Sequence, residues 1–171
     1  VADFAGLDVM YNGNKYYAEA IHPDFAPGKV FTEKYEAGHL GKKTGQGIFD
    51  WSNGRPEIDL EKASPNFDPM DFVAVNLNEA TKIIAQGACA LEDIDLAITN
   101  GTGGMFGPVT LMQNTSPEDL TQRLENLSEK FGKEIFKPTD MIKNGGYILP
   151  PPQNIHVEKD GHIATITIDH P

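Results

Sequence analysis

One stretch carries most of the information about the fold: Gly38-His39-Leu40-Gly41-Lys42-Lys43-Thr44-Gly45-Gln46-Gly47-Ile48-Phe49-Asp50-Trp51. It combines several glycines with a basic pair and ends in aromatic residues, a pattern that neither helical nor strand periodicity produces. Each glycine indicates a backbone position with positive φ or a close approach of another segment. We therefore expect a fixed loop in which the structural residues are Gly38, Gly41, Gly45 and Gly47.

Composition excludes several classes of function. The chain has 171 residues and a formal net charge of −11. Nucleic acids and anionic membrane surfaces need a basic footprint, so we expect neither as a partner. Cys89 is the single cysteine, which rules out an internal disulfide and favours a cytoplasmic protein. No apolar run reaches the roughly 18 residues of a membrane span. The chain starts at Val1 without a methionine and stops at Pro171, so we expect a fragment of a longer polypeptide.

Local signals on either side of the loop predict helices. A helix is expected from about residue 8 to residue 21, where His22-Pro23 ends it. A short helix follows over about 30–37, with Gly38 at the position after its C-cap. The polar segment 52–66 is rich in turn formers and is interpreted as a linker.

A second group of helices begins at Asp68-Pro69, which suit the N-cap and first helical positions. The acidic residues Glu92, Asp93 and Asp95 are expected in the first turn of the next helix, where the helix macrodipole favours anions. This placement explains them without a metal or acid–base cluster. Ser116 and Asp119 have the spacing of a capping box, and a last short helix is expected over about 139–144.

After Pro150-Pro151-Pro152 the hydrophobic period changes from 3.6 to 2. Segments 155–159 and 162–168 alternate and are joined by Asp160-Gly161, which predicts a β-hairpin. The predicted fold class is therefore mainly α, with two tandem helical units and a C-terminal β-hairpin. The predicted boundaries are 1–64, 65–150 and 151–171.

The glycine loop resembles the G-x-x-G-x-K-T-G-x-G-[FI]-[YF] pattern near the end of the C-terminal domain of 3-hydroxyacyl-CoA dehydrogenases. Residues 1–8, Val-Ala-Asp-Phe-Ala-Gly-Leu-Asp, resemble the L-x-D-x-x-G-L-D motif of the same domain. Further along, four short motifs resemble the N-E-A, G-V-A, E-D-I-D and G-P-F-x-L motifs of the family: residues 78–80, 87–89, 92–95 and 107–111. Their order and spacing suggest two copies of the domain, in which Gly107 and Pro108 are structural residues.

The second copy departs from the family pattern. Met70 stands about where the family has its active-site Asn, and Gln113 and Pro117 replace the D and L of the L-x-D-x-x-G-L-D motif. Only Gly145-Gly146-Tyr147 stands where a K-T-G-x-G loop would follow. The second copy is therefore interpreted as a non-catalytic duplicate, and Asn76 and Asn78 are given no catalytic role.

The tail, residues 156–171, resembles the opening hairpin of the enoyl-CoA hydratase (crotonase) family. Together these resemblances imply a fused dehydrogenase–hydratase. They imply oxidation of (S)-3-hydroxyacyl-CoA to 3-ketoacyl-CoA with NAD, of the kind found in fatty-acid β-oxidation. The partners implied are acyl-CoA and a second subunit of a homo-oligomer. Because NAD is bound by a nucleotide-binding domain that this chain lacks, we expect no cofactor, no catalytic residue and no activity in the fragment.

The glycine loop fails the dinucleotide-binding test, because no strand precedes it and no βαβ unit surrounds it. The sequence favours a structural turn over direct contact with CoA, and leaves both open. If the loop borders the acyl-CoA cleft, the candidate substrate-binding residues are His39, Lys42, Lys43 and Thr44. A metal site is not expected, because no two histidines have the spacing of a zinc helix. Two other functions stay open: a purely structural or oligomerisation module, and a stand-alone acyl-CoA binding module.

Overall fold

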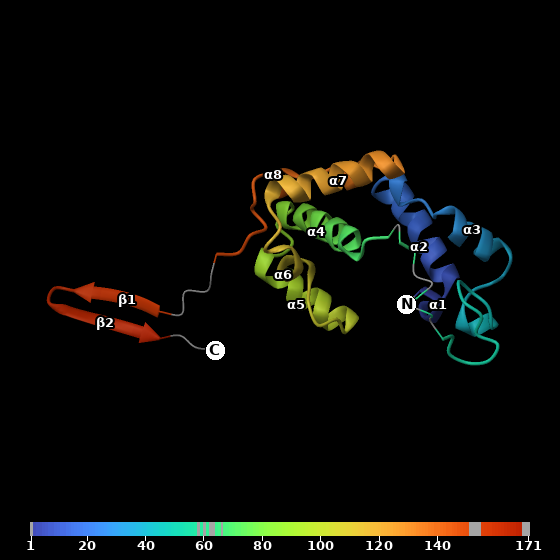
Figure 1. Ribbon diagram of the computed structural model, residues 1–171, viewed down its shortest axis with the longest axis horizontal. Coiled ribbons are helices and arrows are strands. Elements are labelled where there is room, and N and C mark those ends of the chain that lie inside the picture. The colour runs from blue at the N-terminus through green and yellow to red at the C-terminus, as the bar shows by residue number, and fades with distance from the viewer. Residues whose placement is uncertain are drawn as a thin grey trace. The chain divides into compact units, whose positions relative to one another are not determined.

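The computed structural model describes residues 2–57, 59, 61, 64, 65, 67–150 and 155–168. This part of the chain is mainly helical and ends in one antiparallel pair of strands (Figure 1), which confirms the predicted fold class. The α-helices are α1 (Ala2–Ala5), α2 (Leu7–Ala20), α3 (Lys29–Glu36), α4 (Pro69–Ala85), α5 (Leu91–Thr102), α6 (Pro108–Met112), α7 (Pro117–Phe131) and α8 (Asp140–Lys143). Short 3₁₀ turns are η1 (Pro23–Phe25), η2 (Lys42–Thr44) and η4 (Glu134–Phe136), and the strands are β1 (Ile155–Asp160) and β2 (Ile163–Ile168).

The chain divides into two compact units. Unit 1 comprises residues 1–71 with 125–137, and unit 2 comprises residues 72–124 with 138–171. The division passes through α7. In unit 1 the link to residues 125–137 is made at Asp24, whose carboxylate accepts the Ile135 N–H at 3.1 Å and whose carbonyl accepts from the Lys133 ammonium.

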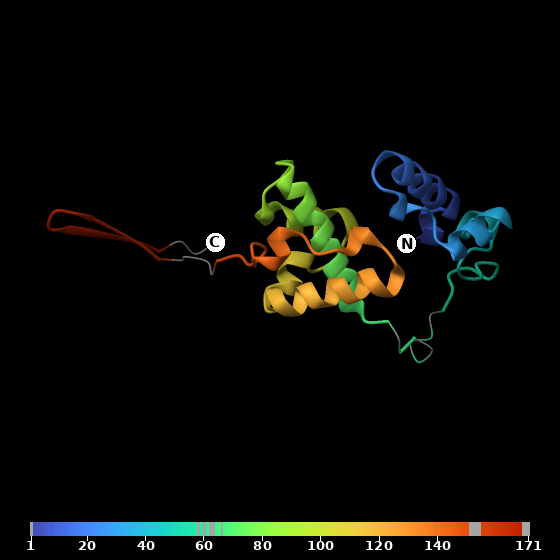
Figure 2. The ribbon, with the colours of Figure 1, turned by 90° about the horizontal axis from the view of Figure 1, so that it is seen from above.

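Unit 1 is built around α2, which packs against α1, α3 and η1 (Figure 2). Leu7 is fully buried, and its N–H donates to the Leu40 carbonyl at 3.1 Å, which fixes the start of α2 to the glycine loop. The rings of Tyr11 and Tyr35 stack at 4.1 Å between centroids and join α2 to α3. Gly38 has φ of 72° directly after the C-cap of α3, as predicted, because that left-handed conformation suits glycine.

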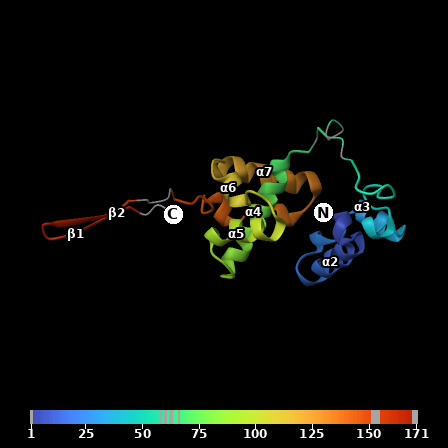
Figure 3. The ribbon, with the colours of Figure 1, turned by 90° about the horizontal axis from the view of Figure 1, so that it is seen from below.

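In unit 2, α5 packs against α6, and α4 lies beside them (Figure 3). The predicted N-cap of α4 is confirmed, since the Asp68 carboxylate accepts the Met70 N–H at 2.9 Å. At α7 one half of the predicted capping box is present: Ser116 Oγ accepts the Asp119 N–H at 3.1 Å, and it donates to Asp119 Oδ2 at 2.9 Å. The large apolar core residues of this unit are fully or almost fully buried: Leu77, Ile94, Val109, Met112, Leu120, Leu124, Ile142 and Tyr147.

The expectation for Asp95 was wrong. Asp93 does serve the first turn of α5, accepting the Ala90 N–H at 3.2 Å. Asp95 lies further along the helix and accepts the N–H groups of Val109 and Thr110, both at 2.8 Å. It therefore caps the start of α6 rather than that of its own helix. A Cβ at Gly107 would collide with the Asp95 carboxylate, which explains why glycine precedes Pro108.

The hairpin pairs Ile155 with Ile168 and Val157 with Ile166, and turns at Gly161 with φ of 57°. The predicted hairpin is thus confirmed, with β1 one residue longer than expected and β2 beginning one residue later. Within the described tail the apolar residues of both strands are exposed. Residues 151 and 152 of the predicted proline linker, and the last residues of the crotonase-like tail, 169–171, lie outside the described residues.

No helix in the described ranges is both long and apolar enough to cross a membrane. The same ranges contain no group of three or more histidine, cysteine, aspartate or glutamate side chains placed to hold a metal ion.

Candidate functional site

The glycine loop is organised around one buried carboxylate, that of Asp3 in α1. Its side chain accepts three hydrogen bonds: from the Ile48 N–H at 2.8 Å, from the Phe49 N–H at 2.9 Å and from the Trp51 indole Nε1–H at 2.8 Å. Asp3 is 4% exposed. Because it joins the start of the chain to the end of the loop, we call this arrangement the Asp3 clasp.

The electrostatics of the clasp keep Asp3 ionised. Burial acts to raise the pKa of this carboxyl, but the Trp51 indole and the N–H groups of Phe49 and Ile48 together outweigh it. The pKa of Asp3 is lowered from its usual 3.8. A carboxylate that accepts several N–H donors is stabilised in its charged form, so the clasp is anionic at neutral pH.

Two glycines make room for the clasp. A Cβ at Gly47 would lie 2.5 Å from Asp3 Oδ1, and one at Gly41 would collide with the Asp3 carbonyl oxygen. Gly41 also has φ of 100°, and Gly45 has φ of 75°, conformations that glycine adopts far more readily than other residues. The structure thus explains why this loop needs glycine at these positions.

Two of the predicted substrate-binding residues are engaged inside the loop. Lys43 Nζ forms an ion pair with Asp8 Oδ1 of α2 at 2.5 Å. The hydrogen bond from Lys43 is the main cause of the lowered pKa of Asp8. Thr44 Oγ1 accepts the Leu40 N–H at 2.9 Å and donates to the Gln46 carbonyl at 2.9 Å. Both side chains therefore stabilise the shape of the loop.

The other two candidates are more available. Lys42 is exposed, and its ammonium lies 5.0 Å from the ring centroid of Phe4. His39 is half-buried, and among the described residues no hydrogen bond or ion pair involves its imidazole. The four predicted residues are thus close in sequence but have two different environments.

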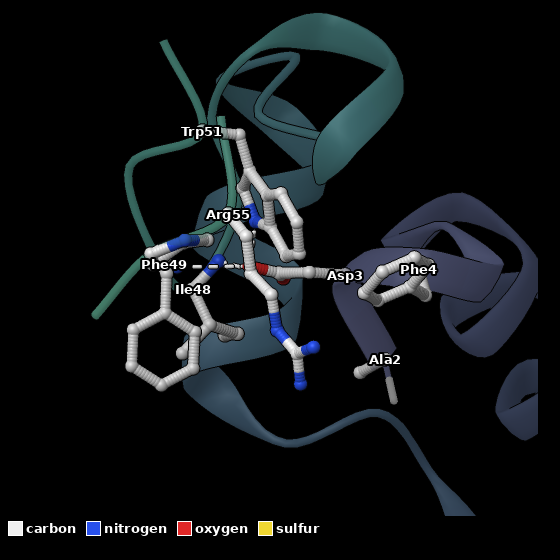
Figure 4. A pocket seen from close by; sticks show the side chains of 8 residues that line it. Ala2, Asp3, Phe4, Ile48, Phe49, Trp51 and Arg55 are labelled. Atoms are coloured by element: carbon white, nitrogen blue, oxygen red, sulfur yellow. Dashed lines mark hydrogen bonds between the residues drawn. The ribbon is translucent and has the colours of Figure 1, made fainter. Parts of the chain in front are cut away.

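An apolar hollow lies beside the clasp (Figure 4). Its volume is about 300 Å³, at the small end of the range of roughly 300–1,000 Å³ for small-molecule sites. Phe4 and Trp51 meet edge to face, with centroids 5.0 Å apart. The residues that line this hollow, called the aromatic hollow below, are Ala2, Asp3, Phe4, Ile48, Phe49, Trp51, Arg55 and Pro56.

In unit 2 a comparable arrangement is centred on Gln113. Gln113 Nε2 donates to the Tyr147 carbonyl at 2.9 Å, and Gln113 Oε1 accepts the Leu149 N–H at 3.0 Å. Tyr147 is fully buried and its hydroxyl donates to the Thr115 carbonyl at 2.5 Å. Burial raises the pKa of this phenol, with the carboxylates of Glu118 and Asp119 adding to the effect. We call this arrangement the Gln113 clasp.

Asn78 has a structural role. It is fully buried, and its Oδ1 accepts the Thr139 N–H at 3.1 Å at the start of α8. Thr81 and Thr139 share a 2.7 Å hydrogen bond beside it. The N-E-A motif therefore connects α4 to α8. Met70, which the sequence resemblance placed about where the family has its active-site Asn, is half-buried in the first turn of α4.

Sequence reasoning assigned no physical role to Asp3 or Gln113, and it misplaced the role of Asp95. All three recognise backbone groups far along the chain: 45 residues separate Asp3 from Ile48. For Asp3, the sequence held one usable signal: an Asp at a motif position together with the glycines of the loop at 41 and 47. A carboxylate packed against backbone N–H groups needs the space that glycine leaves.

Known proteins share this domain in sequence and in fold. Residues 1–51 and 72–145, more than half of the chain, match the family model of the 3-hydroxyacyl-CoA dehydrogenase, C-terminal domain. The 3-hydroxyadipyl-CoA dehydrogenase of Escherichia coli K12 is 28% identical over 71 residues, which cover 42% of this chain and 15% of that protein. The crystal structure of 3-hydroxybutyryl-CoA dehydrogenase from E. coli K12 has a similar fold, with a TM-score of 0.69 at 18% identity. That match covers 84% of this chain and 49% of the other.

These matches place the chain in a class of mainly helical domains found in enzymes that dehydrogenate 3-hydroxyacyl-CoA. The chain belongs to the 3-hydroxyacyl-CoA dehydrogenase C-terminal domain family. It spans less than half of the length of either relative.

Proposed function

We propose that this chain is the helical, substrate-side and dimerisation domain of an NAD-dependent (S)-3-hydroxyacyl-CoA dehydrogenase. The parent enzyme would oxidise 3-hydroxyacyl-CoA to 3-ketoacyl-CoA in the cytoplasm. The observation that carries the proposal is the Asp3 clasp, which holds the family's glycine loop in one conformation and leaves Lys42 and His39 available beside it. The Lys42 ammonium and the His39 N–H donor on a fixed loop suit the anionic CoA portion of a thioester substrate.

The described residues of this chain do not fit NAD. The glycine loop follows α3 rather than a strand, and the described sheet is the antiparallel hairpin β1–β2. A dinucleotide cradle needs a βαβ unit with its glycines between strand and helix. In our proposal the nicotinamide chemistry therefore belongs to another domain of the parent protein, and this chain contributes substrate positioning.

The proposal includes an internal duplication. The order α1, α2, η1, α3 is repeated as α6, α7, η4, α8, with lengths of 4, 14, 3 and 8 residues in the first copy and 5, 15, 3 and 4 residues in the second. Helix α8 is shorter than its counterpart α3. In addition, Met70 of α4 stands about where the family has its active-site Asn. Both differences support a second copy without a role at the reacting atoms.

We also propose that a hydratase domain of the crotonase type follows the hairpin. The support is the alternating pattern of β1 and β2 and their exposed aliphatic residues. An isolated two-stranded hairpin is marginally stable in water, so these residues require a covering layer that a larger sheet would supply.

Calorimetric titration with acetoacetyl-CoA tests the substrate-side role. We expect saturable heat that Lys42→Ala and His39→Ala each weaken by about two- to fivefold, the size of an exposed charge contact. Lys15→Ala, which removes an exposed lysine from α2, is the matched control and should leave the affinity unchanged. Equal affinity in all four proteins would exclude Lys42 and His39 as substrate contacts.

The absence of activity in the fragment is tested separately. With 3-hydroxybutyryl-CoA and NAD⁺ the purified chain should form no NADH. Turnover would contradict our placement of the catalytic groups in another domain.

A purely structural role is the second candidate function, because Lys43 and Thr44 are used inside the loop. In that case acetoacetyl-CoA gives no heat, and sedimentation shows self-association.

A further inference from the structure

We propose that the aromatic hollow of unit 1 is a binding site for a small ligand with an apolar chain and an anionic head. This site is distinct from the Lys42–His39 face of the loop, and the inference does not rest on the proposed function. It rests on three properties of the hollow: apolar side chains line it, the Asp3 carboxylate in its lining already accepts hydrogen bonds, and the Arg55 guanidinium has no partner among the described residues.

The walls are accessible aromatic and aliphatic side chains. Phe4 is 59% exposed, Phe49 45% and Ile48 38%. The three lie around one cavity of about 300 Å³ (Figure 4). Burial of apolar surface is the main source of affinity for a short hydrocarbon chain. A cavity of this size and lining therefore suits a hydrocarbon chain of medium length.

The carboxylate of Asp3, which also lines the hollow, already accepts three hydrogen bonds. Both oxygens of Asp3 accept hydrogen bonds from the Asp3 clasp, and its side chain is buried. It therefore has little capacity to bind a cationic or hydroxyl-bearing ligand without breaking the loop. A ligand of this hollow has to find its polar partner elsewhere.

Arg55 supplies that partner. Its guanidinium reaches across the hollow between Ile48 and Ala2 in Figure 4. Among the described residues Arg55 has no hydrogen bond and no ion pair, although the chain carries a net charge of −11. The planar guanidinium binds carboxylate and phosphate groups through two parallel hydrogen bonds.

Trp51 provides a direct signal, since it is the single tryptophan of the chain and lines the hollow. Octanoate should change the Trp51 fluorescence saturably at millimolar concentration. Octan-1-ol, with the same chain and no charge, should bind at least about fivefold more weakly, and acetate should have no effect. Octyl phosphate shows whether the anionic group of the ligand is a carboxylate or a phosphate. Tighter binding than octanoate assigns the site to a phosphate, and weaker binding assigns it to a carboxylate.

Arg55→Gln is the decisive variant, because an exposed side chain without hydrogen bonds can be changed without loss of the fold. We expect octanoate affinity to fall about fivefold or more, while Lys15→Gln, the matched loss of one exposed charge, has no effect. Ile48→Glu, which places a negative charge in the wall, should also weaken octanoate. Circular dichroism verifies the fold of each variant.

Three results would overturn the proposal: octan-1-ol binding as tightly as octanoate, unchanged affinity in Arg55→Gln, or a fluorescence response that follows dissociation of an oligomer on dilution. The last result would mean that a second copy of the chain covers the hollow. Acetoacetyl-CoA titration of the same variants keeps the test separate from the proposed function, because Arg55→Gln should leave the Lys42–His39 face intact.

Discussion

The Asp3 clasp of unit 1 and the Gln113 clasp of unit 2 each hold a distant backbone segment, and they do so by different chemistry. Asp3 is a buried anion that accepts from three N–H donors. Gln113 is neutral, and it both donates to the Tyr147 carbonyl and accepts from the Leu149 N–H. The aspartate requires a loop that turns several N–H groups toward one point. The amide suits a straighter segment, in which a carbonyl and an N–H face the same side.

In each unit the side chain at the centre of the clasp matches the backbone groups that it holds. In unit 1 the glycines at 41 and 47 allow the backbone to approach Asp3 closely. In unit 2 Gln113 contacts the backbone of the buried Tyr147. A carboxylate at 113 would face the carbonyl of Tyr147, and an amide at position 3 would direct an NH₂ group at an N–H donor. Each clasp is therefore specific for its own loop.

Asp3→Ala should lower stability more than any other single change in the two clasps. Three buried or half-buried donors lose their acceptor at once, and we expect a loss of about 3–5 kcal/mol in the free energy of unfolding of unit 1. Urea unfolding followed by Trp51 fluorescence measures it. Asp3→Asn, which keeps one acceptor oxygen, should fall between Asp3→Ala and the unaltered chain. A loss below about 1 kcal/mol for Asp3→Ala would show that the clasp is not needed to hold the loop.

Gln113→Glu should turn the hydrogen bond from Gln113 to the Tyr147 carbonyl into a repulsive contact between two oxygens. It replaces the NH₂ group that faces the carbonyls of Val109 and Tyr147 with a carboxylate oxygen, leaving a half-buried charge without a donor on that side. We expect a loss of about 2–3 kcal/mol in urea unfolding followed by circular dichroism. Gln113→Met, of similar size but uncharged, is the control and should cost less. Stability equal to that of the unaltered chain would show that the Tyr147 carbonyl does not depend on the amide.

The sequence predicted most of the fold through local rules. The caps at Asp68 and Ser116, the left-handed Gly38 and the hairpin turn at Gly161 each depend on residues within a few positions of one another. The clasps could not be predicted in this way, because hydrophobic periodicity carries no information about which distant N–H group a buried carboxylate will accept. Resemblance to a family identified the motif positions of Asp3 and Asp95 without giving their physical role. Arg55 has no motif around it, so only the structure places it at the aromatic hollow.

Asp95→Ala tests the contact that the sequence interpretation misplaced. Its carboxylate accepts the first N–H groups of α6, so its loss resembles the loss of a helix N-cap, which costs about 1–2 kcal/mol. Asp93→Ala is the matched control in the same acidic run, where a single exposed hydrogen bond is lost. Thermal unfolding should show a larger decrease for Asp95→Ala. Equal decreases would favour the simpler interpretation that both residues serve only the helix dipole.

The smallest expected effect is a difference between the clasps in acid. The pKa of Asp3 is lower in the folded chain than its usual 3.8, so its contribution to stability is complete above pH 3.8 and is lost as the pH falls through the folded pKa. Gln113 does not titrate, and its clasp should keep its strength over the same range. Amide exchange measured by NMR, corrected for the intrinsic pH dependence, should therefore show falling protection at Ile48 and Phe49 before Leu149. In Asp3→Asn the pH dependence at Ile48 and Phe49 should disappear. If instead both units lose protection together in the unaltered chain and in Asp3→Asn, the acid response belongs to other carboxylates, such as that of Asp8, which pairs with Lys43 and has a lowered pKa.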